Sequence, residues 1–389
     1  MKETLEVKNI GAIKNTGILE INPLTVFIGS SASGKSTLMK ILVLMRYIYK
    51  RYNIRNYIKN SHVDDTIFYI RFNDYLRDDI KQVVNKTTSY IRYSVCVNGN
   101  DYVLTYENGK LSMSSTIPDE DLCYTKEVWV SENRGAIATL SSQGSLAKNA
   151  SLGFFFDETF SDFDAATDLV KHYDLNYIGL NMDVVRGGNN QKKFILKPQD
   201  DSYEPFELRH ASSGIQSTAP LMVLVRYFSH EFSFKNSQQR NIIDELFKRD
   251  LTTKYKPEME LADVPKVVHI HVEEPELSLD PRSQRKFIDE LVALAFMKKA
   301  SDRSLELVFA THSPFILNHL NVLLRRNQAQ PHVKPEDLSV YTICDGTAQS
   351  LKAQDLDTGE FVIDSMDLSE PLADIFNEYR GLENARATR

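Results

Sequence analysis

A glycine- and serine-rich stretch at residues 29–36 has the residue types that hold phosphate groups. It reads GSSASGKS and fits G-x-x-x-x-G-K-[ST] at every fixed position. In this pattern the glycines let successive backbone N–H groups point at phosphate oxygens, the lysine reaches the β- and γ-phosphates, and the hydroxyl binds Mg²⁺. We therefore expect ATP or GTP to bind here, with Ser36 as a metal ligand. The expected binding residues are Gly29, Ser30, Ser31, Ala32, Ser33, Gly34, Lys35, Ser36 and Thr37.

A second stretch, at residues 266–281, could act on a bound phosphate. It reads KVVHIHVEEPELSLDP, an apolar and β-branched run that ends in paired carboxylates. Buried parallel strands deliver such acids at their carboxyl ends, where α/β proteins place nucleotide sites. We expect Glu273 to hold Mg²⁺ through water and Glu274 to polarise the attacking water as general base. Asp280 lies in the turn that follows.

Histidines in these strands have different expected roles. A further buried strand, SLELVFAT, leads to His312, which at a strand end can hydrogen-bond a γ-phosphate and sense its loss. His269 and His271 share a strand face with Glu273 and so imitate a metal site. A strand buried under helices more often uses such histidines as neutral, hydrogen-bonded core groups. We therefore expect His269 and His271 to be core residues.

The elements that must position these residues can be read from the apolar pattern. Residues 24–28 predict a strand that leads into the phosphate loop, and a helix follows the loop. The helical stretch SQRKFIDELVALAFMKK lies between Glu274 and His312, so these two residues belong to one β–α–β unit. Residues 89–114 carry Asn-Gly pairs at 98–99 and 108–109, which predict a three-stranded meander.

The segment at residues 46–59 is basic and aromatic, and its partner stays open. Arg51, Arg55 and Lys59 would form a stripe on a helix, beside four interleaved tyrosines. Aromatic rings beside cations can hold a nucleic-acid strand. A helix with its tyrosines toward the core and its cations in solvent has the same pattern. The sequence leaves nucleic acid, a protein partner and solvent as alternatives for Arg46 to Lys59.

Composition narrows the class of protein. The chain has 389 residues, 42% apolar and 25% charged, and a net charge of −7, which describes a soluble globular protein without a general attraction to nucleic acid. Its three cysteines are far apart and offer no disulfide framework or zinc spacing. The N-terminus lacks a signal peptide, and the longest apolar run is interrupted by Lys40 and Arg46. We expect a cytoplasmic protein with no membrane partner.

Four stretches occur in the order of the ABC-type ATPases. The stretch at 29–36 is similar to Walker A, ASSGIQ at 211–216 resembles the signature L-S-G-G-Q, EEPELSLD at 273–280 is similar to Walker B with its D-loop, and His312 resembles the switch histidine. Glu273 in place of aspartate, the THSP switch and the short EVKNIGAIKN start resemble the OLD/RecF/SMC-like branch more than transporters. Within that branch the chain resembles the ATPase subunits of bacterial antiphage defence systems such as Septu and PARIS.

The resemblance implies an α/β fold, the ABC-type P-loop ATPase head. Such a head has a mixed sheet with flanking helices, an N-terminal antiparallel β-subdomain and a helical lobe that carries the signature. It implies ATP and Mg²⁺ as cofactors, with Lys35, Glu274 and His312 in catalysis. ATP would be sandwiched between Walker A of one subunit and the signature of another. The residues that would act in trans are Ser212, Ser213, Gly214, Gln216 and Asp280.

The same resemblance and the shifts in composition divide the chain into six segments. Either Gln143 or the SENRG strand end at 131–135 qualifies for the Q-loop of the family. The expected segments are 1–45, an N-terminal lobe with Walker A; 46–130, an insertion arm with the basic helix and the meander; 131–230, a helical lobe with the signature; 231–264, a helical insertion; 265–345, the Walker B, D-loop and switch strands; and 346–389, a C-terminal hairpin and helix.

The function that the resemblance implies is a slow, switch-like ATPase that dimerises or forms higher oligomers. It would sense phage infection and regulate a separate nuclease effector, since the chain leaves no room for a nuclease domain after residue 345. One alternative is a RecF/SMC-like ATPase of DNA repair or maintenance, with residues 46–59 on DNA. The soluble ATPase of a transporter is a third hypothesis. The extra length, Glu273 and the THSP turn count against it.

Overall fold

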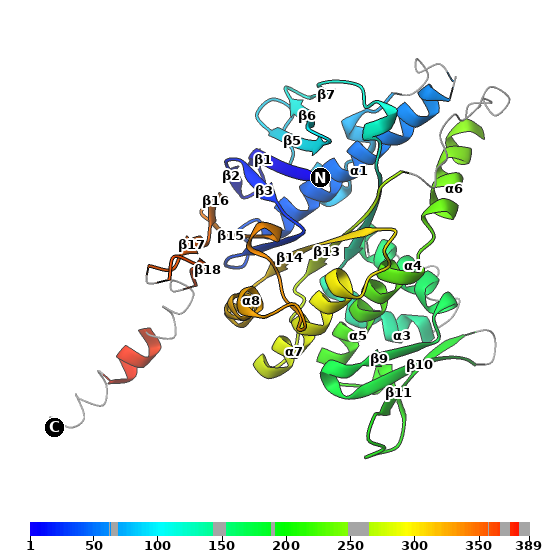
Figure 1. The fold of residues 1–389 in the computed structure, drawn as a ribbon, viewed down its shortest axis with the longest axis vertical. Helices are drawn as coiled ribbons and strands as arrows, with labels where there is room; N and C mark the ends of the chain where they lie inside the picture. The colour runs from blue at the N-terminus through cyan, green and yellow to red at the C-terminus, as the bar shows by residue number, and fades with distance from the viewer. Residues whose placement is uncertain are drawn as a thin grey trace.

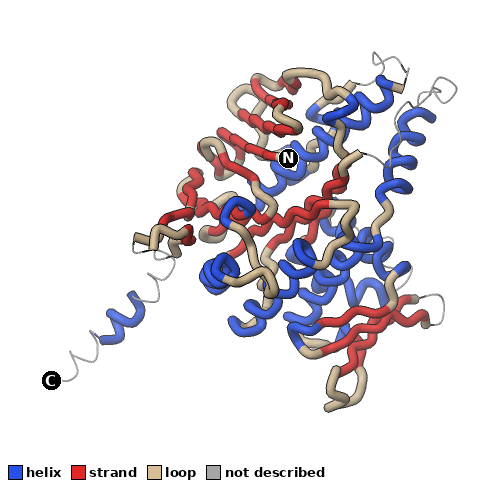
Figure 2. The backbone as a smooth tube through the Cα atoms, viewed as in Figure 1, coloured by secondary structure: helices blue, strands red, loops and turns tan. Residues whose placement is uncertain are grey.

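The fold is built around one large mixed sheet. The computed structural model describes residues 1–61, 63, 69–142, 153–187, 191–247, 264–356, 358–365 and 374–380. Its main sheet has 12 strands in the order β7-β6-β5-β1-β2-β16-β15-β4-β14-β13-β8, with β3 paired to β1, and helices flank it (Figures 1 and 2). The mixed α/β fold expected from the sequence is confirmed.

Five neighbouring strands of this sheet are parallel. They are β15 (Leu338–Cys344), β4 (Leu24–Ile28), β14 (Ser304–Thr311), β13 (Lys266–Glu273) and β8 (Tyr124–Val130). They are apolar along most of their length because both faces are covered, and every residue of β4 is buried. Since parallel strands end at the same edge, the segments after β4, β13 and β14 come together there. This edge holds the phosphate loop, the paired carboxylates and His312.

The other half of the sheet is antiparallel. β1 (Lys2–Ile10) pairs with β2 (Ile13–Asn15), with β3 (Leu19–Ile21) and with β5. The predicted meander forms as β5 (Tyr90–Val97), β6 (Asn100–Glu107) and β7 (Lys110–Met113), joined at Asn98-Gly99 and Asn108-Gly109 in left-handed backbone. Because β5 pairs with β1, the meander continues the main sheet. β16 (Thr347–Ser350) pairs with β15, and β17 (Lys352–Gln354) with β18 (Phe361–Ile363).

Helix α1 (Lys35–Asn60) runs without interruption from the phosphate loop through the basic segment. It packs against β8, β14, β13 and β1. The boundary drawn between residues 45 and 46 therefore falls inside one helix. Arg46 is 1% exposed, since it lies on the face that packs against the sheet. The prediction that Arg46 could contact an external partner is therefore wrong. Lys59, further along the same helix, is exposed.

The remaining helices cover the sheet and build a lobe beside it (Figure 1). The lobe contains a four-stranded antiparallel sheet that the sequence analysis did not predict, in the order β12-β11-β10-β9. Its elements are α3 (Ile137–Ser142), α4 (Phe154–Leu169), β9 (His172–Leu175), β10 (Leu180–Arg186), β11 (Lys192–Pro198), β12 (Phe206–Glu207) and α5 (Ser213–Arg226). The other helices are α2 (Asp78–Lys81), α6 (Phe234–Phe247), α7 (Pro281–Val292) and α8 (Pro314–Arg325).

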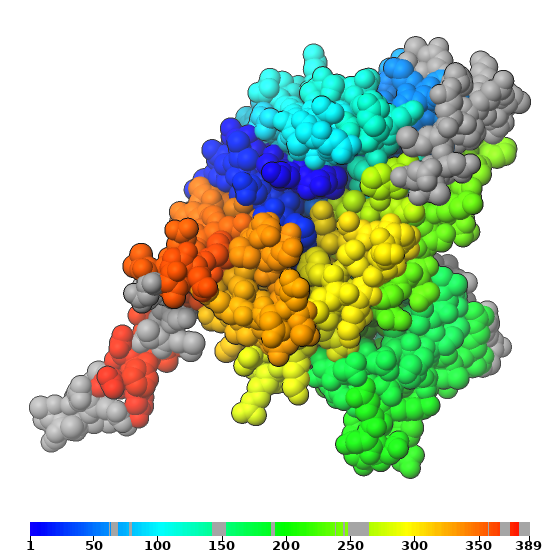
Figure 3. Space-filling view, in the orientation of Figure 1, coloured from blue at the N-terminus to red at the C-terminus, as the bar shows by residue number. Residues whose placement is uncertain are grey.

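The two ends of the described chain lie in different surroundings. β1 is in the middle of the antiparallel half, whereas residues 374–380 form a short helix that points away from the body (Figures 1 and 3). Among the helices that the structure describes, none is both long enough and apolar enough to cross a membrane.

Candidate functional site

The phosphate loop has a backbone that only glycine permits at its first position. Gly29 follows β4, and a Cβ built on it would lie 2.3 Å from the carbonyl oxygen of Ile343 on β15. This distance is far below van der Waals contact, and backbone cannot move aside cheaply. Within the loop, Ala32 has a φ of 62°, a left-handed backbone that is uncommon for a residue with a side chain. The loop is therefore curled tightly against the neighbouring strand, as a phosphate cradle requires.

The side chain of Lys35 is folded back over the loop. Its Nζ donates hydrogen bonds to the carbonyl oxygens of Gly29 at 2.9 Å and Ser30 at 2.8 Å. Burial lowers the pKa of Lys35, while the charges of Glu274 and Glu276 act in the opposite direction. An ammonium held at the mouth of a curled loop is positioned to meet the phosphates of a nucleotide.

Glu273 ends the buried strand β13 and lies against the start of α1. Its side chain is hydrogen-bonded to Ser36, and it is 7% exposed. Burial raises the pKa of Glu273, and the charge of Lys40 and the Ser36 bond oppose that shift. A carboxylate and a hydroxyl side by side are hard oxygen donors of the kind that Mg²⁺ prefers. The donor set fits the metal role expected for both residues.

Glu274 has a strained backbone and an exposed carboxylate. Its φ is +45°, rare for a residue with a side chain, and its N–H donates to the carbonyl oxygen of Ala310 at 2.8 Å. Its Oε1 lies 3.7 Å from Nε2 of His312, and both side chains are about one-third exposed. Strain of this kind persists where the surroundings enforce it, and it concentrates at functional sites. The backbone turns the carboxylate out of the strand and toward His312.

Glu276 is a site residue that the sequence analysis missed. Its Oε1 accepts hydrogen bonds from Oγ1 of Thr311 at 2.6 Å and from the backbone N–H of His312 at 2.9 Å. The carboxylate therefore fixes the end of β14 and the backbone of His312. The motif resemblance assigned no role to this third acid, although its spacing after the paired carboxylates was visible.

Arg134, inside the SENRG stretch, was also missed as an individual residue. It is fully buried, and its guanidinium donates to the carbonyl oxygens of Glu273 at 2.7 Å, Glu274 at 2.6 Å and Ser217 at 2.9 Å. Burial lowers its pKa to about 10, so it remains charged at neutral pH. One side chain thus connects the end of β13 to helix α5. Gln143, the other candidate for the Q-loop, lies outside the described residues.

The N-terminus of α5 carries the signature-like residues. Ser212 is the N-cap, Ser213 is exposed, and Gly214 is buried against the turn after β13. A hollow of about 500 Å³ lies beside this helix start, and Ser213, Glu132 and Ser278 are among the residues that line it. Gln216 also lines this hollow, and its side-chain amide donates to two nearby backbone carbonyls, those of Arg209 and Ala211. In this structure Gln216 therefore holds the approach to the helix from a position beside the hollow.

The contact of Gly214 with the turn after β13 predicts a sharp contrast between two glycines. A Cβ at Gly214 would lie 2.5 Å from the carbonyl oxygen of Ser278, whereas one at Gly135 would meet nothing within 4 Å. We expect Gly214→Ala to lower the free energy of unfolding by about 1–3 kcal/mol, the cost of overpacking. Gly135→Ala should change it by less than about 0.5 kcal/mol. Denaturant titration of both variants measures the contrast, and equal stabilities would contradict the close approach.

Asp280 caps the helix that follows the turn. Its Oδ1 accepts from the backbone N–H groups of Arg282 at 2.9 Å and Ser283 at 3.2 Å. The hydrogen bond from the Ser283 hydroxyl is the largest cause of a lowered pKa of Asp280, and the backbone N–H groups act in the same direction. The residue is exposed and begins α7.

The structure divides the sequence-predicted residues into two groups. Lys35, Ser36, Glu273, Glu274 and His312 lie together at one edge of the sheet. The residues at the start of α5 belong to the lobe, because α5 packs mainly against α4 and the short helices Glu132–Ala136 and Tyr227–Glu231. None of those partners carries the phosphate loop. The start of α5 nevertheless adjoins the carboxylate edge, through the contact of Gly214 with the turn after β13 and through the bonds of Arg134.

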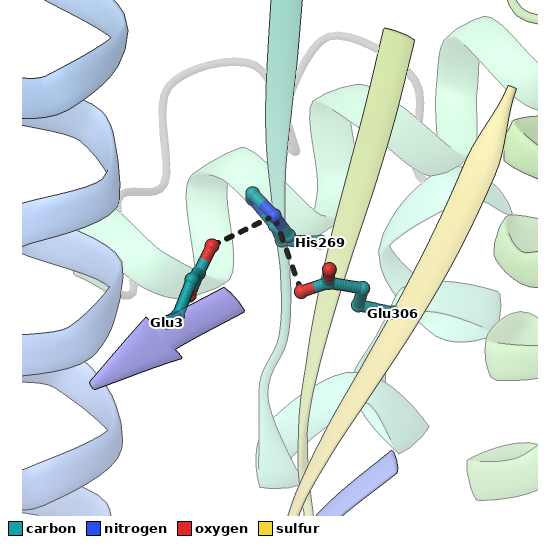
Figure 4. A group of neighbouring side chains, drawn as sticks. All are labelled: Glu3, His269 and Glu306. Carbon is teal, nitrogen blue, oxygen red and sulfur yellow. Dashed lines mark ion pairs between the residues drawn. The ribbon is translucent and has the colours of Figure 1, made fainter. Parts of the chain in front are cut away.

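His269 belongs to a buried cluster with Glu3 and Glu306, whose spacing could suit a metal ion (Figure 4). Nε2 of His269 lies 3.3 Å from Glu306 and 3.6 Å from Glu3. The guanidinium of Arg46, however, lies 2.8 Å from the same Glu3 carboxylate and 2.7 Å from that of Glu306. A cation is thus already supplied by the chain, and the cluster is an ion-pair network in the core.

The pKa values of the two histidines of β13 are shifted in opposite directions. Burial and Arg46 act to lower the pKa of His269, but the charges of Glu127 and Glu306 outweigh them and raise it. Burial, with Arg46, lowers the pKa of His271 to about 3. His271 therefore donates from Nδ1 to the carbonyl oxygen of Val128 and accepts from Arg46 at Nε2. Both are core residues, as expected. His271 is neutral, whereas the raised pKa of His269 favours its charged form.

No family model matches this chain, and no curated protein matches it. Among solved structures it is similar to the SMC head domain from Thermotoga maritima, at 10% identity and a TM-score of 0.41, over 91% of this chain and 99% of that one. It is similar to the recombination mediator RecF at 14% identity and a TM-score of 0.34, over 90% and 98%. It is also similar to a dimeric ATP-binding cassette with bound ADP and Pi, at 11% identity and a TM-score of 0.30, over 90% and 99%.

Proposed function

We propose that this chain binds ATP with Mg²⁺ and hydrolyses it to ADP and phosphate. The observation that carries the proposal is the meeting of Lys35, Ser36, Glu273 and Glu274 at the carboxyl edge of the parallel strands. These segments are more than 230 residues apart in sequence, and each supplies a residue type that phosphate chemistry needs.

Each residue has a role in this proposal that follows from its surroundings. Lys35 meets the β- and γ-phosphates when it leaves the carbonyl oxygens that it now contacts. Mg²⁺, when bound, neutralises charge on the phosphates, and Ser36 and Glu273 would hold it. Glu274 orients the attacking water and accepts its proton, and His312, 3.7 Å away, contacts the γ-phosphate side.

The signature-like half is proposed to complete the ATP site of a second copy. Ser212, Ser213 and Gly214 stand at the N-terminus of α5, where backbone N–H groups and the helix dipole favour an anion. They lie on the lobe, where α5 packs mainly against α4 and residues 132–136 and 227–231. Two chains placed head to tail would bring each helix start to the partner's ATP. A homodimer or higher oligomer would then close when ATP binds.

The proposed cellular role is that of an ATP-gated regulator of a separate nuclease in antiphage defence. The motif order and the THSP switch support this role through the family resemblance of the sequence. Purifying the full chain together with the products of neighbouring genes tests it. A nuclease that co-purifies and is released by ATP supports the role. Co-purification of DNA without a nuclease would favour the alternative, a RecF/SMC-like ATPase of DNA maintenance.

Lys35→Ala is expected to weaken ATP binding by about 10- to 100-fold. This range corresponds to the loss of about 1.5–3 kcal/mol of charge-assisted hydrogen bonding to the phosphates. Lys59→Ala removes the same charge at the other end of α1 and should leave the affinity unchanged. Equilibrium dialysis with labelled ATP measures both. Equal ATP affinities for the two variants would contradict the assignment of the phosphate loop.

A further inference from the structure

A second cavity lies apart from the phosphate site, where α1 faces β8, α2, α4 and α6. It has a volume of about 290 Å³. None of its lining residues belongs to the phosphate loop, the paired carboxylates or the signature-like stretch. The volume is at the lower end of the range of roughly 300–1,000 Å³ that small-molecule sites occupy. A ligand of this cavity would therefore be small.

The charges around the cavity favour an anion. Lys40, Lys50, Arg77 and Lys126 line it, against the two carboxylates Glu127 and Glu158. Lys126 is paired with Asp162 at 3.0 Å, and Glu127 with His269 at 2.9 Å. Lys50 is half-buried, and burial together with the nearby charge of Lys126 lowers its pKa to about 8. An anionic group beside Lys50 would relieve both of these effects.

The walls of the cavity are aromatic. Trp129, Phe155, Phe154, Tyr47 and Tyr75 all line it. The rings of Trp129 and Phe155 lie 4.5 Å apart, and the Lys40 ammonium lies 5.0 Å from the centre of the Phe155 ring. Aromatic walls beside ammonium groups are suited to a planar ring that is joined to a negatively charged group.

The indole N–H of Trp129 has no acceptor in the described part of the chain. The residue is 4% exposed, and its Nε1 is buried without a hydrogen-bond partner among the described residues. Buried donors are seldom left without an acceptor, because the lost hydrogen bond costs about 1–3 kcal/mol. Less than 1 Å² of Nε1 is accessible, so this donor faces packed protein and not the space of the cavity.

We propose that this cavity binds a nucleotide, with the base against the aromatic walls and the phosphate beside Lys50 and Arg77. The ligand is either a free mononucleotide or the terminal nucleotide of a single strand, since both present the same base and phosphate. The cavity volume admits one nucleotide and excludes a duplex. This site is distinct from the phosphate loop, and its occupation does not depend on ATP hydrolysis.

Trp129 is the only tryptophan of the chain, so its fluorescence reports directly on the cavity. The full chain is first saturated with ATPγS and Mg²⁺, so that the phosphate loop is occupied. It is then titrated with AMP, with CMP, with adenosine and with a short 5′-phosphorylated single strand. We expect saturable quenching by AMP or CMP, and weaker binding of adenosine because it lacks the phosphate. Equilibrium dialysis of labelled AMP checks the fluorescence result.

Lys50→Met removes the ammonium and keeps the length of the side chain. We expect it to weaken mononucleotide binding by about tenfold or more, from the loss of one charge-assisted hydrogen bond. Lys59→Met, the matched control on the same helix, should bind as the unmodified chain does. Arg77→Gln is a second variant, for use if Lys50→Met fails to fold. It should weaken mononucleotide binding to a similar extent. Lys40 is left unchanged because its charge also acts on Glu273.

The two sources of the ligand give different results. A mononucleotide that binds as tightly as the oligonucleotide identifies the free nucleotide, whereas an oligonucleotide that binds at least about tenfold more tightly identifies a strand terminus. Absence of saturable binding by every probe would overturn the proposal. So would equal affinities of AMP for the unmodified chain, Lys50→Met and Arg77→Gln, each shown to be folded by its melting temperature.

Discussion

Glu274→Gln is expected to slow ATP hydrolysis by about 10²- to 10⁴-fold and to leave ATP binding intact. The range is the usual contribution of a general base. Glutamine has the size of glutamate but cannot take a proton from water. In the proposed mechanism this carboxylate, which the strained backbone at residue 274 turns toward His312, orients the attacking water. The substitution leaves Lys35 and the phosphate loop, the proposed ATP-binding residues, unchanged. Steady-state phosphate release and ATP dialysis measure the two effects separately.

The control for this prediction is Glu107→Gln, an identical change at the exposed end of β6. It should hydrolyse ATP at the unmodified rate. ATP-bound Glu274→Gln chains should also accumulate as closed assemblies, because hydrolysis, the step that would reopen them, is blocked. A Glu274→Gln protein that hydrolyses ATP at the rate of Glu107→Gln would show that another residue is the base.

Arg46→Met is expected to lower the free energy of unfolding by about 3–5 kcal/mol. The guanidinium is fully buried and neutralises Glu3 and Glu306, so its removal leaves His269 to balance the charge of two buried carboxylates. It also removes the hydrogen bond to His271. Arg46 links α1 to β1, β13 and β14. Its substitution should therefore lower the free energy of global unfolding rather than cause local fraying. Denaturant unfolding of the variant measures the change.

Lys59→Met serves as its control, since it removes a charge from an exposed position of the same helix. Its stability should lie within about 0.5 kcal/mol of the unmodified chain. An Arg46→Met chain as stable as Lys59→Met would mean that the buried carboxylates are neutralised in some other way. A metal ion in the Glu3, His269 and Glu306 group would be one such way, and metal analysis of the purified chain would reveal it.

The phosphate loop and the paired carboxylates could be predicted because their information is local. Gly29 to Ser36 are consecutive, and the strand before them and the helix after them are visible in the same short window. Glu273 and Glu274 end an apolar run that leaves few alternatives to a buried strand. Parallel strands then place both stretches at one edge. Nothing beyond the order of the elements was needed for this part of the site.

Other parts depend on contacts that a local pattern does not contain. Arg46 reads as one of several cations among tyrosines, but its partners Glu3 and Glu306 lie 43 and 260 residues away. Arg134 meets backbone carbonyls of Glu273 and Glu274, 139 and 140 residues away, and backbone acceptors carry no sequence signal at all. The sheet of the lobe was missed because its strands, such as β9 and β12, are short and polar on one face.

The proposal that two chains share each ATP site is tested most directly by mixed variants. One chain carries Lys35→Ala, which disables its phosphate loop. The other carries Ser213→Arg, which blocks the start of α5. Ser213 is chosen because its side chain is exposed, so the change should not disturb the fold, whereas Gly214 has no room for a side chain.

Each variant alone should be inactive, because every site in its homodimer contains one disabled half. In the mixed dimer one site combines both defects and the other contains neither. A purified heterodimer, verified by two affinity tags, is therefore expected to regain hydrolysis that neither homodimer has. A verified heterodimer with no recovery of phosphate release, formed from variants that are folded, would contradict the shared site.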